Sequence, residues 1–264
     1  MYFLTMRFVV NVMSNHFMVI TAVVVMLAGC VHKCEIAPAP LAATGHTRFE
    51  VFGMLGEYVA RDTDGIRIEE FDGYYPTETG AAAHFEKLLR AFCAEEGINP
   101  TFDKKVGSEG DIIFFSPAIA AVIDRHYTNG TLDESVFDGA SDEDLLRYVA
   151  GAYLRFGDDK KRAVIVELNA GRKLHTVGIV LSRLGCSGVK LYYTTNLVPA
   201  SCVLVFSPSQ RVKKRLGILK ELAVSELTDH PDDLELWVEI PPNQATNPTS
   251  TSVMPPARPE ARQP

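Results

Sequence analysis

Residues 141–168 have the sequence SDEDLLRYVAGAYLRFGDDKKRAVIVEL, which combines a strong helix start with a buried strand. Ser141 is a favourable N-cap residue, and the acidic residues Asp142, Glu143 and Asp144 suit the positive end of a helix dipole. These signals predict a helix that runs through Arg155. The apolar, β-branched run at residues 163–168 predicts a buried strand. We therefore expect an α+β fold of alternating helices and strands.

Similar signals extend in both directions from this stretch. Gly185 predicts the end of a helix over residues 173–184, and Asp64-Gly65 is typical of a hairpin turn between strands at residues 48–62 and 66–71. The other expected elements are helices over residues 79–96 and 207–227, a helix that begins at Ser116-Pro117, and strands over residues 111–115, 189–194, 202–206 and 234–240.

Two stretches of the chain match at a constant offset of 91 residues. The matching residues are His84 and His175, Gly97-Ile98 and Gly188-Val189, and Phe115-Ser116-Pro117 and Phe206-Ser207-Pro208. This match predicts two similar α+β lobes, over residues 46–140 and 141–240. The alternative to a duplication is that the two Ser-Pro helix starts arose independently. If the lobes are real, we expect a ligand between them or at the paired helix starts.

The overall composition limits the class of protein. The chain of 264 residues has a formal charge of −7, with 47% hydrophobic and 22% charged residues. These values exclude a collagen-like chain, a fully disordered chain and a polytopic membrane protein. Because non-specific binding of DNA or RNA requires a basic surface, we expect no nucleic acid as a partner.

The N-terminal segment carries an apolar run at residues 17–28, after the single charge of Arg7. A run of this length is typical of a cleaved signal peptide over residues 1–29, with an uncleaved anchor as the alternative. Leu27-Ala28-Gly29-Cys30 then resembles the lipobox of bacterial lipoproteins. The resemblance implies that Cys30 carries acyl chains and holds the protein at a membrane in the bacterial envelope. In such lipoproteins an Asp directly after the modified cysteine favours the inner membrane. Because that position is Val31 here, the resemblance implies the outer membrane if the host is Gram-negative.

Two further segments have the composition of spacers. Residues 30–45 are rich in Pro and Ala and are expected to be a lipid-anchored linker. Residues 241–264 are rich in Pro and polar residues, and they are expected to be a disordered tail.

With Cys30 lipidated, the remaining cysteines are Cys34, Cys93, Cys186 and Cys202. The lipoprotein resemblance implies an oxidising compartment, in which Cys186 and Cys202 are the preferred disulfide because they are close in sequence. The other pairings, and buried thiols, stay open at this point.

The candidate ligand-binding residues are Ser116 and Ser207, at predicted strand-to-helix junctions, and His84 and His175, at predicted helix starts. Backbone N–H groups at such junctions can hold an anion, and a serine with a histidine base can act as a nucleophile. Helix capping is the simpler interpretation of both serines. Tyr192-Tyr193 is a candidate surface for stacking a sugar or peptide, with cross-strand packing as the alternative. No motif for a cofactor or a metal is present, so we expect neither.

The order of elements at residues 141–194 is similar to that of the periplasmic domain of the ExbD/TolR biopolymer-transport family. The likeness lies in a helix, the strand at residues 163–168, a helix with Val177, Val180 and Leu184 on one face, and a further strand. That family has a membrane helix with a functional acidic residue, and residues 1–29 contain no Asp or Glu. The resemblance therefore implies no proton-coupled activity.

Together these features predict a lipid-anchored protein of the cell envelope, without catalytic residues, that binds an envelope protein or peptidoglycan. An envelope hydrolase with Ser116 or Ser207 as nucleophile is the alternative.

Overall fold

The computed structural model describes residues 46–56, 70–128, 131–168, 172–194, 201–221 and 234–241. This part of the chain forms helices and antiparallel sheets, which confirms the predicted α+β class. None of its helices is long and apolar enough to cross a membrane. The predicted signal peptide, linker and hairpin turn at Asp64-Gly65 lie outside the described residues, as does the tail after residue 241.

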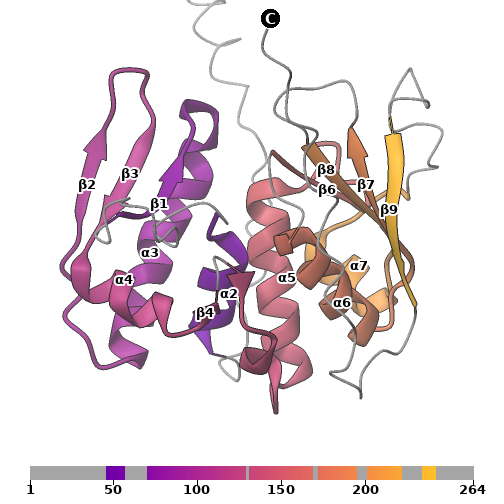
Figure 1. The fold of residues 1–264 in the computed structure, drawn as a ribbon, viewed down its shortest axis with the longest axis horizontal. Coiled ribbons are helices and arrows are strands. Elements are labelled where there is room, and N and C mark those ends of the chain that lie inside the picture. The colour runs from indigo at the N-terminus through magenta and orange to yellow at the C-terminus, as the bar shows by residue number, and fades with distance from the viewer. Residues whose placement is uncertain are drawn as a thin grey trace, which may run out of the picture. The chain divides into compact units, whose positions relative to one another are not determined.

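The first lobe, as we define it here, contains the elements from α2 to η2 (Figure 1). They are α2 (Thr47–Met54), β1 (Glu70–Tyr74), the 3-10 helix η1 (Pro76–Glu78), α3 (Thr79–Glu95), β2 (Asp103–Val106), β3 (Ile112–Phe115), α4 (Pro117–Asp124), the short hairpin of β4 (Tyr127–Thr128) and β5 (Thr131–Leu132), and the 3-10 helix η2 (Glu134–Phe137). The sheet has the order β1-β3-β2, and both pairings are antiparallel.

The second lobe repeats the order helix, strand, helix, strand, strand, helix that runs from α2 to α4, and it adds one strand. It contains α5 (Asp142–Phe156), β6 (Val164–Leu168), α6 (Arg172–Arg183), β7 (Ser187–Thr194), β8 (Ser201–Ser207), α7 (Gln210–Leu216) and β9 (Leu234–Ile240). Its sheet has the order β6-β8-β7-β9, so β6, β8 and β7 correspond to β1, β3 and β2. Strand β9 has no counterpart in the described part of the first lobe.

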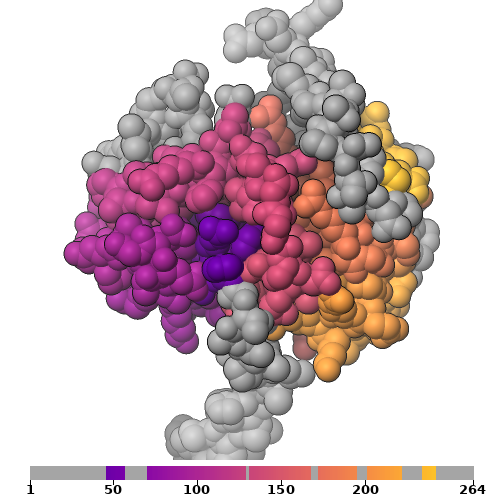
Figure 2. All heavy atoms as spheres, turned by 90° about the horizontal axis from the view of Figure 1, so that it is seen from below, coloured from indigo at the N-terminus to yellow at the C-terminus, as the bar shows by residue number. Residues whose placement is uncertain are grey.

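Helix α2 is a departure from the sequence-based prediction of a strand over residues 48–62. Phe49, Val51 and Phe52 favour a strand locally, yet seven of the eight residues of this helix are buried. A helix that is apolar on nearly all sides is stable inside a protein core, where packing overrides local propensity. In Figure 2, α2 (indigo) lies between the remainder of the first lobe and α5.

Two glycines allow α2 and α5 to pack closely against each other. A Cβ atom at Gly53 would overlap the backbone oxygen of Tyr148, and one at Gly151 would overlap the backbone oxygen of Glu50. Tyr148 precedes Gly151 by three residues, and Glu50 precedes Gly53 by three residues. The contact is therefore symmetric between the two helices. Because glycine has no Cβ, the two backbones can meet directly at this crossing.

The two Phe-Ser-Pro motifs are not structurally equivalent. Phe206 lies in the main core, whereas the ring of Phe115 packs under Lys105, on the face of its sheet away from the helices. Ser116 is the N-cap of α4 as predicted, but Ser207 is the last residue of β8, and the N-cap position of α7 is Ser209. Helix α7 also ends far earlier than predicted, at Leu216, because Gly217 adopts a left-handed conformation with φ of 62°.

Candidate functional site

Arg155, in the last turn of α5, reaches across to the first lobe. Its side chain is 3% exposed, and Nη1 donates hydrogen bonds of 2.9 Å to both carboxylate oxygens of Asp72 on β1. The same nitrogen donates to the backbone oxygen of Met54 at 2.6 Å, and Nε donates to Glu78 Oε1 at 3.3 Å. The guanidinium carbon lies 4.0 Å from the ring centroid of Tyr74. Arg155 therefore joins α5 to both α2 and β1.

The charges around Arg155 are buried but compensated. Burial acts to lower the pKa of the Arg155 guanidinium, but Asp72, Tyr74 and Glu78 together outweigh it, and the pKa is raised. Asp72 is fully buried, and its Oδ1 also accepts hydrogen bonds from the backbone N–H groups of Gly56 and Gly73. Burial raises the pKa of the Tyr74 hydroxyl well above its usual value. The Arg155 guanidinium is thus held in its charged form.

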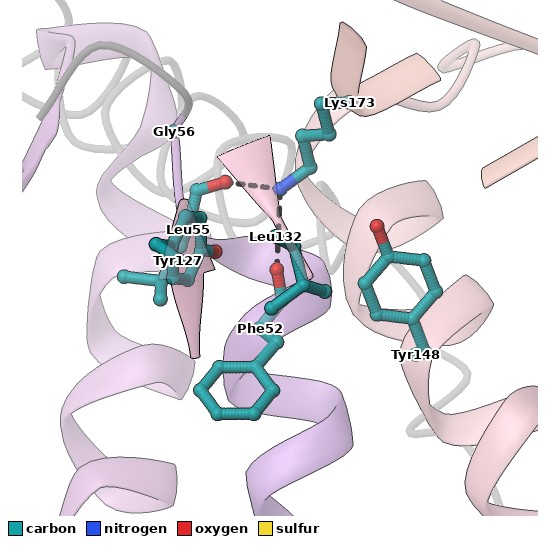
Figure 3. A pocket seen from close by; sticks show the side chains of 7 residues that line it. All are labelled: Phe52, Leu55, Gly56, Tyr127, Leu132, Tyr148 and Lys173. Atoms are coloured by element: carbon teal, nitrogen blue, oxygen red, sulfur yellow. Dashed lines mark hydrogen bonds between the residues drawn. The ribbon is translucent and has the colours of Figure 1, made fainter. Parts of the chain in front are cut away.

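Lys173, in the first turn of α6, makes a second link between the lobes. Figure 3 shows its ammonium group directed at the backbone oxygens of Phe52 and Leu55, at the C-terminal end of α2. These oxygens have no partner within the helix, and a cation at this end also suits the helix dipole. A small hollow beside the ammonium group is lined by Phe52, Leu55, Gly56, Tyr127, Leu132, Tyr148 and Lys173. It has room for roughly one water molecule.

Glu167 is the acidic side chain of this region that the structure leaves incompletely paired. It lies on β6 opposite Cys202 of β8, and only 6% of its surface is exposed. Its Oε2 atom is buried and has no hydrogen-bond partner among the described residues. Burial raises the pKa of Glu167 to about 7, against the opposing effect of the cations Lys173 and Arg155. Glu167 is therefore poised between its neutral and charged forms near neutral pH.

We call Asp72, Glu78, Arg155, Glu167 and Lys173 the interlobe charge cluster. The fields of the other four charged side chains all reach Glu167. With Glu167 ionised the cluster contains three carboxylates and two cations, and with Glu167 neutral the charges balance. Sequence reasoning missed these residues, although a charged Glu within the apolar strand at residues 163–168 was a signal of them.

The structure does not bring the predicted serine and histidine candidates together. The Ser116 hydroxyl donates to the backbone oxygen of Thr101 at 3.0 Å and accepts from Ile119 N at 3.4 Å. His84 Nε2 lies 3.0 Å from Glu50 Oε1, which fixes α3 to α2. Neither serine forms a hydrogen bond to a histidine within the described residues, so the geometry of a serine hydrolase is absent there.

His175 has a different environment from His84. Its ring packs against the indole of Trp237 on β9, with 6.0 Å between the ring centroids. Burial lowers the pKa of His175, which keeps the ring neutral at neutral pH. Of the four candidates from the sequence, His175 is the one that lies beside a partly exposed aromatic side chain.

The predicted disulfide between Cys186 and Cys202 is not formed. Cys202 pairs with Tyr193 in the ladder of β7 and β8, whereas Cys186 lies next to the opposite end of β7. At about 3.3 Å per residue along a strand, the separation is roughly 20 Å, far beyond the reach of a disulfide. Both side chains are buried. Cys30 lies outside the described residues, so the lipobox stays a prediction.

Comparison with known proteins finds no matching family model and no matching curated protein. Solved structures of the homing endonuclease I-DmoI do match. A structure of its mesophilic variants is 18% identical over 66% of this chain and 94% of that chain, with a TM-score of 0.45. I-DmoI in complex with DNA and Mn is 17% identical over 67% of this chain and 98% of that chain, also with a TM-score of 0.45.

This finding contradicts three expectations from the sequence. The first is the function, as a binder of an envelope protein or peptidoglycan or, alternatively, as an envelope serine hydrolase. The second is the lipoprotein and cell-envelope class of protein to which that function belonged. The third is the exclusion of nucleic acid as a partner. The physical reasons are plain. A short targeting motif gives no information about the fold that follows it, and a net charge does not describe a local binding surface. A likeness at this level transfers no activity and no site residues to this chain.

Proposed function

We propose that the described body is a proton-responsive module, in which one proton at Glu167 sets how firmly the first helices of the two lobes are held. The observation that carries the proposal is the buried Oε2 atom of Glu167, which has no hydrogen-bond partner in a cluster of otherwise paired charges. A buried carboxyl group of this kind is stable as the neutral acid and costly as the anion.

The charged groups that act on Glu167 come from four other elements, and the thiol of Cys202 on β8 lies directly opposite it in the ladder. Lys173 on α6 and Arg155 on α5 favour the ionised form, whereas Asp72 on β1 and Glu78 on η1 oppose it. Burial favours the neutral form and is the largest of these effects. The balance places the titration near pH 7, where a small change of conditions alters the charge.

Ionisation of Glu167 acts on the links between the lobes. The new anion attracts Lys173 and Arg155, and these two side chains hold the C-terminal end of α2 through the backbone oxygens of Phe52, Met54 and Leu55. Attraction towards Glu167 competes with these hydrogen bonds. The protonated form therefore holds α2 more tightly than the ionised form does.

Hydrogen exchange tests the proposal directly. The informative amides are Leu55 N–H, bonded to the backbone oxygen of Val51, and Gly56 N–H, bonded to Asp72. We expect their protection, corrected for intrinsic exchange, to fall between pH 6 and pH 8 in the full-length protein. In Glu167→Gln, which keeps a neutral side chain of the same shape, protection should not change over this range.

The exposed residue Glu109 provides the matched control, because Glu109→Gln makes the same substitution at a carboxyl group that solvent already surrounds. That variant should behave as the wild type. The same loss of protection in Glu167→Gln as in the wild type would falsify the proposal.

A further inference from the structure

A β-bulge places the only tryptophan of the chain on the helix-facing side of the second sheet. In the pairing of β7 with β9, Leu191 lies opposite Val238 and Tyr192 lies opposite Leu236, so Trp237 is the extra residue. A bulge changes the direction of the side chain that it contains, and bulges are common beside binding sites. Here it turns Trp237 towards α6, although β9 is an edge strand with exposed neighbours.

Trp237 meets two other rings at this position. The centroids of Tyr193 and Trp237 are 5.0 Å apart with an interplanar angle of 30°, and those of His175 and Trp237 are 6.0 Å apart with an angle of 42°. The three rings come from β7, β9 and α6, and each is partly exposed. We call His175, Tyr193 and Trp237 the aromatic cluster. Partly exposed aromatic rings from three separate elements thus meet at one place.

The surroundings of the aromatic cluster are acidic. Glu235 lies directly opposite Tyr193 in the ladder of β7 and β9, so the two side chains share a face. Glu134 on η2 acts electrostatically on His175. The nearby basic side chains on these elements have other partners: Arg172 donates to Thr131, Lys173 to the backbone oxygen of Phe52, and Lys190 pairs with Glu239. Neutral rings flanked by carboxylates match a positively charged ligand.

We propose that the aromatic cluster binds an organic cation that carries a quaternary ammonium group. Such a group has no N–H to donate, and it is recognised by the negative faces of indole and phenol rings. Glu235 supplies a counter-charge beside the rings. This site shares no residue with the interlobe charge cluster, so it stands or fails independently of the proposed function.

The test uses Trp237 as its own reporter, because no other tryptophan contributes to the fluorescence of the full-length protein. Choline is titrated against the protein, and its uncharged isostere 3,3-dimethyl-1-butanol is titrated in parallel. We expect a saturable change with choline and about tenfold weaker binding of the neutral compound, which has the same shape and lacks the charge. No saturable change with choline, or equal affinity for both compounds, would overturn the proposal.

Two variants on the same strand localise the site. Glu235→Gln should weaken choline binding by about threefold, whereas Glu239→Gln, whose carboxylate pairs with Lys190, should leave it unchanged. Tyr193→Leu should abolish binding measured by calorimetry, with the fold checked by circular dichroism. If Glu239→Gln weakens binding as much as Glu235→Gln does, the overall negative charge of the surface attracts the cation, and the proposed aromatic site is rejected.

Discussion

The first and second lobes share a strand order but fill it with different kinds of side chain. The first lobe packs aromatic residues between its sheet and α3, whereas the second lobe is filled mainly by aliphatic residues. The buried aromatic residues there include Phe71, Tyr74, Phe85 and Phe114, and the aliphatic ones of the second lobe include Ile165, Leu174, Val177, Leu191 and Leu204. The same topology therefore tolerates different packing, as is general for cores of conserved volume and pattern.

What the lobes share is the crossing of α2 and α5, and what distinguishes them lies at their edges. The second lobe has the additional strand β9, and the opposite face of its sheet carries a separate apolar cluster of Val164, Tyr192, Val203 and Val205. In the first lobe the corresponding edge strand, β2, is exposed along its whole length. The comparison teaches that the junction holds the body together, while the added strand provides new surface.

The largest expected effect concerns the junction. In Asp72→Asn the buried Arg155 loses its carboxylate partner, and this should lower the free energy of unfolding by about 4 kcal/mol. Asp103→Asn, at an exposed position in the same sheet, should change it by less than about 0.5 kcal/mol. Denaturation in urea measures both. Similar effects of the two substitutions would show that the junction is no more important than the lobe surface.

The second effect is the pH dependence of stability that Glu167 introduces. Burial raises its pKa from the ordinary 4.5 to about 7, so within this interval the folded protein keeps a proton that the unfolded chain has lost. The free energy of unfolding should therefore fall as the pH rises from about 4.5 to about 7. The difference between the two pKa values corresponds to about 3 kcal/mol.

Glu167→Gln should remove this contribution, so the stability difference between variant and wild type should grow steadily across the interval. Thermal or urea denaturation at several pH values measures it. A constant difference between pH 4.5 and pH 7 would contradict the expectation.

The third prediction tests the symmetry of the helix crossing. Gly53→Ala and Gly151→Ala each place a methyl group against the backbone of the opposite helix, and each should cost about 2 kcal/mol. Gly80→Ala, in α3 with no atom near the added methyl group, should be neutral or stabilise by up to about 1 kcal/mol. Unequal costs at Gly53 and Gly151 would show that one lobe adapts at the crossing more readily than the other.

The smallest effect separates the two Phe-Ser-Pro motifs. Ser116→Ala removes the cap of α4 and should cost about 1 kcal/mol. Ser207→Ala lies at a strand end, outside the first turn of α7, and should cost less than about 0.5 kcal/mol. Equal costs would mean that the two motifs are equivalent after all.

Local signals predicted much of this fold from the sequence. The helix start at Ser141, the strand at residues 163–168 and the cap at Ser116 appear as expected, because each depends on residues within a few positions of one another. Helix α2 did not follow from local signals, since the side chain of its N-cap residue, His46, makes no capping bond and its residues favour a strand. It owes its conformation to packing against α5, which begins far along the chain.

The candidate site was hidden for the same reason. Asp72 and Arg155 are 83 residues apart, and Lys173 is 121 residues from Phe52, so no local pattern connects them. The predicted candidates Ser116 and His84 proved to be local or structural contacts. One distant contact could have been suspected, because a glutamate inside a run of apolar strand residues must find either a partner or a proton.

The capping of α2 by Lys173 has a consequence for synthesis on the ribosome. The helix is among the first described elements to emerge, but the side chain that completes its C-terminal end follows 121 residues after Phe52. At common translation rates this interval lasts about 6 to 24 s. Until then residues 47–54 lack the partners that make them a helix, and the growing chain exposes an apolar segment of the kind that chaperones bind.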